Sequence, residues 1–215
     1  MAAKKSRKSK VAKKAKKTIK KVAKKTTKKA SKKVVDGTSS KGMSNGSAST
    51  SAKVTKKPTV KAAVSVGKPI GNFLLNSTGG KQIDLLNLRG KNVVLYFYPK
   101  DDTPGCTLEG KDFTRLHSDF NSNNSEVYGV SRDSVESHEK FRNKYCYSID
   151  LLSDADEKLC KHFGVIKPKN MYGRMVIGIE RSTFVIDADG ILRREWRKVS
   201  VDGHAAEVLD FVKTL

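Results

Sequence analysis

The chain has 215 residues and a formal net charge of +22, and that charge is concentrated at one end. Residues 1–62 contain 22 of the 44 Lys and Arg residues but only one of the 22 Asp and Glu residues, so residues 63–215 are nearly neutral. Three cysteines are too few for a secreted disulfide framework, and no apolar run approaches the ~18 residues of a membrane span. We therefore expect no membrane segment, a reducing compartment, and one folded domain (63–215) behind a basic tail (1–62).

The basic tail is sequence of low complexity. Residues 1–35 consist mostly of Lys, Ala, Thr and Val, and residues 36–53 are rich in Ser, Gly and Thr. Strong self-repulsion and little apolar surface predict a disordered segment followed by a flexible linker. Because neutralised phosphates release counterions, we expect residues 4–33 to bind nucleic acid without sequence preference.

The domain begins with short elements. Residues 70–75 are expected to enter as a strand or hairpin, followed by a turn at residues 77–80 and a short strand at residues 83–85. Asn92–Tyr98 is apolar almost throughout and bounded by breakers, which is typical of a buried central strand. A helix is predicted from Cys106 to about Phe120, with an inner face of Leu108, Phe113, Leu116 and Phe120.

Alternating strands and helices follow. Residues 127–131 and 149–152 are predicted strands, residues 135–145 a helix capped by Ser134, and residues 155–163 a helix capped by Asp154. Residues 182–186 and 191–196 form a predicted hairpin around an Asp-Gly turn. A last helix, 204–215, places Ala205, Val208, Leu209 and Val212 inward. The order predicts an α/β fold with a central mixed sheet flanked by helices.

Cys106 is the candidate nucleophile. It follows the predicted strand and the turn sequence from Pro99 to Gly105, so it falls where the next helix should begin. A helix start directs unpaired N–H groups and partial positive charge at such a thiol, which favours the reactive thiolate. In α/β sheets this carboxyl end of a central strand is also where sites are found.

The spacing Pro99-x-x-x-Thr103-x-x-Cys106 resembles the peroxiredoxin active-site signature. Its continuation, Thr103-Pro104-Gly105-Cys106-Thr107-Leu108-Glu109, resembles that of the peroxiredoxin Q, or bacterioferritin comigratory protein, branch. Further similarity lies in residues 151–154, 181–187 and 196–199. The resemblance covers about residues 64–215 and implies a thioredoxin-like fold and a thiol-dependent peroxidase.

The resemblance also assigns roles. Cys106 would be the peroxidatic nucleophile, Thr103 a hydrogen-bonding partner of thiolate and peroxide, Pro99 a wall that excludes water, and Arg181 the cation that pairs with the thiolate. Glu109 would orient neighbouring donors. Each residue also has an ordinary structural alternative. Cys106 could be a buried core cysteine, Thr103 a turn or capping residue, and Pro99 the residue that ends the strand. Arg181 could be a surface salt-bridge partner and Glu109 a solvated carboxylate.

The sequence departs from the branch at the resolving cysteine. Branch members place it five residues after the peroxidatic cysteine or in the following helix, and these positions hold Lys111 and Arg142. Three routes for reducing the oxidised Cys106 stay open: an external thiol, Cys146 or Cys160. Cys146 follows a predicted helix and is either the resolving residue, within or between chains, or a bystander, whereas Cys160 is interpreted as core packing.

The resulting hypothesis is a peroxidase that reduces hydrogen peroxide and alkyl hydroperoxides through a cysteine sulfenic acid, with thioredoxin or another thiol as reductant. It would be a monomer or weak dimer. His117, His138, His162 and His204 lack metal-ligand spacing, so no metal and no cofactor are expected. The alternative function is a chromatin-binding redox sensor with little catalytic turnover.

Localisation depends on the tail. Its composition resembles the Lys/Ala/Thr-rich arms of linker histones, and its lysine runs suit nuclear import, so we expect the nucleus. The alternative is a plastid or mitochondrion, but transit peptides are rich in arginine and the tail contains only Arg7.

Overall fold

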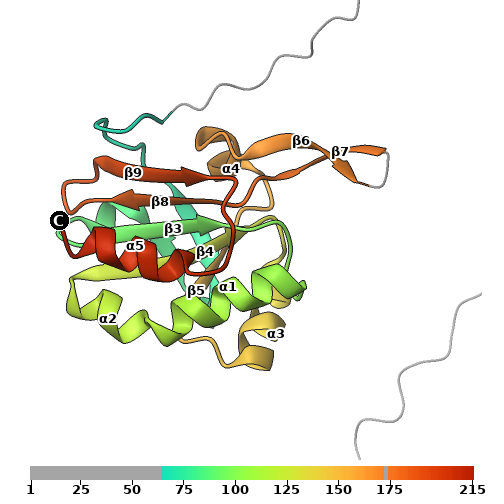
Figure 1. Ribbon diagram of the computed structural model, residues 1–215, viewed down its shortest axis with the longest axis horizontal. Coiled ribbons are helices and arrows are strands. Elements are labelled where there is room, and N and C mark those ends of the chain that lie inside the picture. Colours follow the sequence, from blue (N-terminus) through green and yellow to red (C-terminus); the bar gives the residue numbers. More distant parts are fainter. Residues whose placement is uncertain (1–63, 172–173) are drawn as a thin grey trace, which may run out of the picture. The chain divides into compact units, whose positions relative to one another are not determined.

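The computed structural model describes residues 64–171 and 174–215, and the predictions for the basic tail lie outside them. A seven-stranded sheet has the order β2-β1-β5-β4-β3-β8-β9 (Figure 1). Its strands are β1 (Leu74–Ser77), β2 (Gln82–Asp84), β3 (Asn92–Phe97), β4 (Ser125–Ser131), β5 (Asp150–Ser153), β8 (Ser182–Ile186) and β9 (Leu192–Arg197). Strands β3, β4 and β5 are parallel and the other pairs antiparallel, which confirms the predicted mixed sheet.

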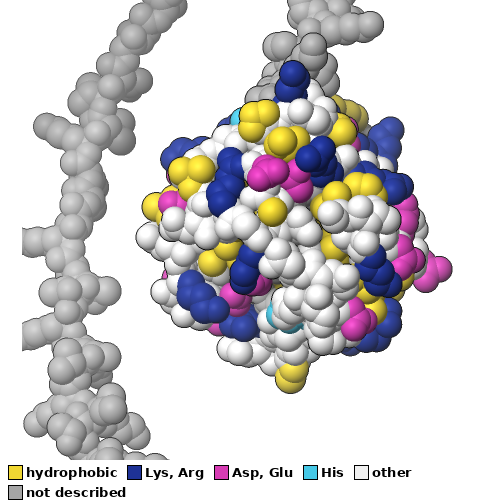
Figure 2. Space-filling model, turned by 90° about the vertical axis from the view of Figure 1, so that its left-hand side faces the viewer, with side chains coloured by type: hydrophobic (Ala, Val, Ile, Leu, Met, Phe, Trp, Pro, Cys, Tyr) yellow, Lys and Arg dark blue, Asp and Glu magenta, His cyan; other side chains and the backbone are white. Residues whose placement is uncertain are grey.

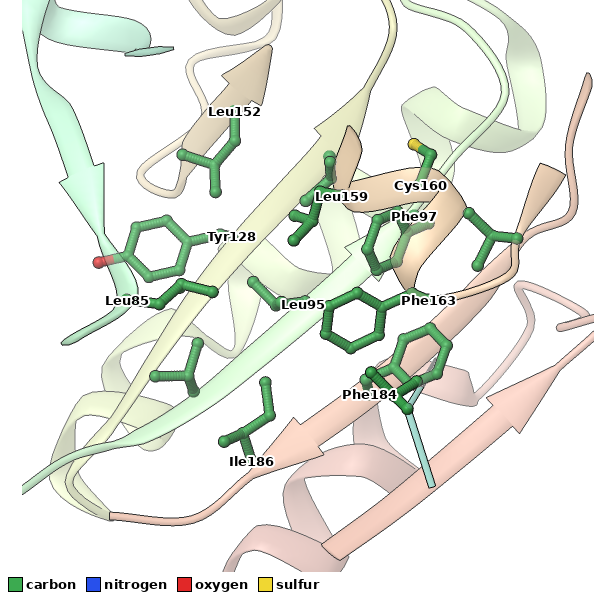
Figure 3. Packing of buried hydrophobic residues seen from close by; sticks show 14 of the residues in the cluster. Leu85, Leu95, Phe97, Tyr128, Leu152, Leu159, Cys160, Phe163, Phe184 and Ile186 are labelled. Atoms are coloured by element: carbon green, nitrogen blue, oxygen red, sulfur yellow. The ribbon is translucent and has the colours of Figure 1, made fainter. Parts of the chain in front are cut away.

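The helices cover both faces of this sheet. They are α1 (Pro104–Arg115), α2 (His117–Ser122), α3 (Val135–Tyr145), α4 (Lys158–His162) and α5 (His204–Val212). Alternate residues of β3 supply the two cores: Val93, Leu95 and Phe97 face one, and Val94 and Tyr96 face the other. The first core packs against α4 (Figure 3), and the second against α1, α2, α3 and α5.

The region after β3 differs from the sequence prediction in two respects. The single helix expected from Cys106 to Phe120 is two helices, α1 and α2, which are separated at Leu116. Leu108 is 49% exposed instead of facing inward. The predicted inner residues Phe113 and Phe120 are fully buried, so the apolar periodicity identifies the core-facing side except at Leu108.

Helix α4 is shorter than predicted. It begins at Lys158 instead of Ala155, and its N-cap is Glu157 in a left-handed conformation. The carboxylate of Asp154 nevertheless accepts hydrogen bonds from the main-chain N–H groups of Leu159 and Cys160, at 3.2 and 2.7 Å. Asp154 therefore supplies hydrogen-bond acceptors for the free N–H groups at the start of α4, although it lies outside the helix.

A hairpin that the sequence analysis did not predict leads into β8. Its strands are β6 (Ile166–Met171) and β7 (Arg174–Ile179), which pair antiparallel as a separate two-stranded sheet (Figure 1). By contrast, the predicted hairpin β8–β9 and the inner face of α5 are confirmed.

The surface of the folded part has mixed charge. On the face that Figure 2 presents, basic and acidic side chains are interspersed, with no large field of one sign. None of the helices in residues 64–171 and 174–215 has the length and apolar character needed to cross a bilayer.

Candidate active site

Cys106 lies in the first turn of α1, directly after the loop that follows β3. Thr103 is the N-cap residue and Pro104 opens the helix, where its missing N–H costs no hydrogen bond. The first helical hydrogen bond runs from the N–H of Thr107 to the oxygen of Thr103, at 2.8 Å. The thiol is only 2% exposed. The predicted position at a helix start is thus the observed one.

Arg181 binds the sulfur of Cys106. It lies between β7 and β8, and its Nη2 donates to Sγ across 3.3 Å, while Nη1 donates to the carboxylate of Glu109. Burial opposes the charge of Arg181, but Glu109 and Cys106 raise its pKa above the usual value. The main-chain oxygen of Arg181 accepts from the N–H of Val199 at 3.0 Å, which fixes the backbone behind the guanidinium.

Glu109 is a buried carboxylate one turn beyond Cys106. It is 1% exposed, and burial raises its pKa to about 7 although Arg181 pulls in the other direction. Its Oε1 has no hydrogen-bond partner among the described residues. From its sequence position, Glu109 is expected either to orient neighbouring donors or to be solvated; in the structure it is buried and accepts from Arg181.

Thr103 and Pro99 line the same loop. The hydroxyl of Thr103 donates its proton to the main-chain oxygen of Lys100, 3.1 Å away. Because a hydroxyl has a single proton, Thr103 in this arrangement can only accept toward a bound molecule. Pro99 is half-buried after the end of β3.

A buried network that the sequence analysis missed ties this loop to α3. The carboxylate of Asp101 lies 2.9 Å from Nδ1 of His138 and accepts from Ser137 at 2.7 Å and from Tyr98 at 2.8 Å. Nε2 of His138 faces the main-chain oxygen of Leu152 at 3.2 Å. His138, for which the sequence predicts no metal-ligand role, is fully buried and hydrogen-bonded.

Asp102 makes the second connection between the loop and α3. It has a left-handed backbone, with φ 55°, and its carboxylate accepts from Lys144 at 2.6 Å and from Tyr145 at 2.7 Å. Asp101, which is buried, and Asp102, which is exposed, therefore both connect the tight turn before Cys106 to α3.

Basic side chains occupy the two expected resolving positions. The ammonium of Lys111 lies 5.1 Å from the centre of the Tyr145 ring. Arg142 binds Asp150 at 3.3 Å and the main-chain oxygen of Tyr147 at 3.3 Å. Lys111 therefore connects α1 to α3, and Arg142 connects α3 to β5 and to the residues that follow α3.

The other two thiols have opposite environments. Cys146 is exposed at the C-cap of α3, in a left-handed conformation with φ 54°. Cys160 is fully buried in the core on the other face of the sheet, where burial raises its pKa well above the usual value (Figure 3). Among the described residues, no group of three or more His, Cys, Asp and Glu side chains is arranged to hold a metal.

A buried thiol at the start of α1, in contact with an arginine in a thioredoxin-like α/β fold, defines the class as a thiol-dependent redox protein. The AhpC/TSA family model matches residues 66–195. Peroxiredoxin Bcp of Xanthomonas campestris is 51% identical over 139 residues, which is 65% of this chain and 87% of the relative. Peroxiredoxin Bcp of Bacillus subtilis is 44% identical over 150 residues, 70% of this chain and 96% of the relative.

Solved structures agree with these relatives. Xanthomonas campestris peroxiredoxin Q superposes with a TM-score of 0.64 at 50% identity, covering 66% of this chain and 90% of the other. A cysteine-to-serine variant of Xylella fastidiosa PrxQ gives 0.68 at 44% identity, covering 70% and 96%. The chain belongs to the AhpC/TSA family, in its peroxiredoxin Q/Bcp branch. It is therefore a thiol peroxidase, an oxidoreductase that uses a hydroperoxide and a thiol reductant.

Proposed function

We propose that Cys106 is the peroxidatic nucleophile and that it reduces hydrogen peroxide and alkyl hydroperoxides. The thiolate attacks one peroxide oxygen; the S–O bond forms while the O–O bond breaks. The other oxygen leaves as water or an alcohol once it has taken up a proton, and Cys106 becomes a sulfenic acid. The observation that carries this proposal is the 3.3 Å contact between Arg181 Nη2 and Sγ at the start of α1.

The surrounding groups suit this reaction. The guanidinium of Arg181 stabilises the thiolate and the negative charge that develops on the leaving oxygen. The free N–H groups at the start of α1 add partial positive charge at the same place. Thr103 accepts from the O–H of a hydroperoxide, and Pro99 shields the sulfur from water. The breadth of substrate is supported by the alkyl peroxide reduction activity described for the Xanthomonas bacterioferritin comigratory protein.

The sulfenic acid is then reduced by an external thiol, such as thioredoxin, directly or after a disulfide with Cys146. Two structures of the Xanthomonas protein carry cysteine-to-serine substitutions, at positions 48 and 84 of that chain. Cys106 and Arg142 have the same separation in this chain, which supports the interpretation that Arg142 replaces a resolving cysteine. Cys146 is the exposed thiol of the described residues and Cys160 is buried, so Cys146 is the candidate within the chain.

Substitution at the nucleophile tests the proposal. Cys106→Ser is expected to abolish peroxide consumption in a thioredoxin-coupled assay, while Cys160→Ser keeps it. Consumption that persists in Cys106→Ser overturns the assignment. A single slow, stoichiometric oxidation of the wild type would instead favour the redox-sensor alternative.

Intact mass spectrometry after one equivalent of peroxide identifies the next step. A gain of one oxygen indicates a sulfenic acid that awaits an external thiol. A loss of two hydrogens indicates a disulfide, which Cys146→Ser should prevent if Cys146 resolves Cys106. The same measurement distinguishes a disulfide within one chain from one between two chains by its mass.

The tail is proposed to hold this peroxidase near chromatin, in the nucleus, as a monomer or weak dimer. The support is compositional: the concentration of lysine in residues 4–33 and the lack of aromatic residues through residue 62, which favour phosphate contacts over base stacking. A plastid or mitochondrial location is the alternative, and fluorescence microscopy of the full chain fused at its C-terminus separates the two.

A further inference from the structure

The β6–β7 hairpin carries a lysine whose side chain reaches the strand end next to the active site. Lys169 lies opposite Val176 in the hairpin, yet its Nζ donates to the main-chain oxygen of Ile179, at the far end of β7. Ile179 is fully buried in the core. The lysine therefore crosses the hairpin diagonally and binds the last residue of the strand, not its direct neighbour.

The carbonyl that Lys169 binds lies two residues before Arg181. Between them, the N–H of Glu180 donates to the oxygen of Val165 at 2.7 Å, which closes the base of the hairpin. Arg181 then extends its guanidinium to Cys106. A displacement of this strand end would consequently move the group that contacts the sulfur.

The charges around Lys169 indicate that it belongs to the same electrostatic site. Burial lowers the pKa of Lys169, and the positive charge of Arg181 lowers it further, as does that of Arg132. Glu180 and Cys106 act in the opposite direction. Two cations that repel each other in a partly desolvated place are stabilised by an anion near both, and the Cys106 thiolate is such an anion.

We propose that Lys169 is a positioning residue of the peroxidase site. It fixes the strand end that carries Arg181, and its positive charge adds to that of Arg181 in stabilising the Cys106 thiolate. This inference rests on the proposed function of Cys106 and Arg181. The charged groups that act on Lys169 come from three places: Cys106 on α1, Arg132 after β4, and Glu180 with Arg181 between β7 and β8; Glu109 on α1 acts on Arg181.

The test measures Cys106 itself rather than turnover. In the full-length protein, the rate of iodoacetamide alkylation is followed against pH at the peptide that contains Cys106. Lys169→Met is expected to move the midpoint upward by about one pH unit, because the thiolate loses a cation. Lys169→Arg, which retains the charge and a donor, should stay near the wild type. Lys167→Met, two residues earlier on β6, is the matched control and should leave the midpoint unchanged.

Single-turnover oxidation supplies the second readout. The second-order rate constant for peroxide should fall about tenfold in Lys169→Met, whereas the later step with thioredoxin keeps its rate. Lys169→Gln, which keeps an N–H donor without the charge, separates the two contributions and guards against a Met variant that folds poorly. An unchanged midpoint and an unchanged peroxide rate in both variants overturn the proposal. Peroxide consumption by Cys106→Ser would overturn the proposed nucleophile instead, so the two failures are distinguishable.

Discussion

The hydroxyl of Tyr147 donates a hydrogen bond to the main-chain oxygen of Thr107, across 3.0 Å. The contact joins the residue after Cys146 to the residue after Cys106, so the exposed and the buried thiol belong to chain segments that touch. The ring of Tyr147 also lies over the middle of α1. A Cβ atom on Gly110 would be 2.7 Å from its Cζ, closer than real contacts allow.

Gly110→Ala should therefore destabilise the protein. Because the obstacle is a packed ring rather than the end of a flexible side chain, we expect a loss of about 1–3 kcal/mol in the free energy of unfolding. Denaturant titration measures it. Gly71→Ala is the control, since its Cβ would meet only ordinary contacts of 3.7 Å or more. Equal stability of the two variants would show that Tyr147 moves aside without cost.

The buried carboxylate of Glu109 predicts a pH dependence of stability. Its pKa is about 7 in the folded chain, against 4.5 for an ordinary glutamate. The folded state thus favours the protonated form of Glu109. The resulting contribution to the free energy of unfolding is fully present below pH 4.5 and is lost as the pH rises to about 7. Glu109→Gln cannot ionise, so the wild type should lose up to about 3 kcal/mol relative to it over this range. Unfolding curves from pH 4 to 8 test this, and parallel pH profiles would refute it.

Asp101 anchors the active-site loop through buried hydrogen bonds. Asp101→Asn exchanges an acceptor that serves His138, Ser137 and Tyr98 for a group that also carries donors, and should cost about 2–3 kcal/mol of stability. The neighbouring exposed change, Asp102→Asn, should have little effect because its partners are solvated. Thermal unfolding of both variants provides the comparison, and a similar melting temperature for the two would contradict the buried-network argument.

Restoring a cysteine at Arg142 should create a resolving thiol. After one equivalent of peroxide, Arg142→Cys combined with Cys146→Ser is expected to lose two hydrogens by intact mass, through a disulfide with Cys106; Cys146→Ser excludes the disulfide that Cys146 could form. Removal of the Arg142–Asp150 pair should also ease the local unfolding of α3 that brings the two sulfurs together. Arg142→Ser, which removes the same pair without adding a thiol, is the control, and must not yield that disulfide.

Deletion of residues 1–62 should separate the two proposed activities. The full chain is expected to bind duplex DNA with an affinity that falls steeply with salt, at a slope of about 0.9 per phosphate neutralised. The truncated chain should lose this binding and keep its peroxidase activity. Electrophoretic mobility shifts at two salt concentrations measure the first, and DNA binding that survives truncation would assign it to residues 63–215.

The sequence predicted the parts of the fold that repeat a simple pattern. β3 is apolar after Asn92, the β8–β9 turn has its Asp-Gly signal, and α5 has a regular inner stripe. Hairpin β6–β7 has no such signal: the consecutive residues Met175, Val176 and Ile177 are all exposed, so the middle of β7 does not alternate between a buried and an exposed face.

Within the site, the motif predicted that Cys106 lies at a helix start, and the family resemblance implied that Arg181 pairs with it. It did not predict how Asp101 and His138 hold the loop, because that contact joins residues 37 apart through tertiary packing. Similarly, nothing in the local sequence indicates that Lys169 binds the end of its own hairpin. A pattern of residue types specifies which group reacts, whereas the contacts that position it depend on side chains from separate elements.

Cys160 gives the chain an internal probe of its own opening. Its thiol lies in the core on the side of the sheet opposite Cys106, and burial holds it in the unreactive protonated form. A thiol reagent can label Cys160 only in molecules that have opened, so the labelling rate reports the population of the open state. The same molecule can be examined with Cys106 reduced and oxidised, which measures how strongly the catalytic cycle disturbs the rest of the fold.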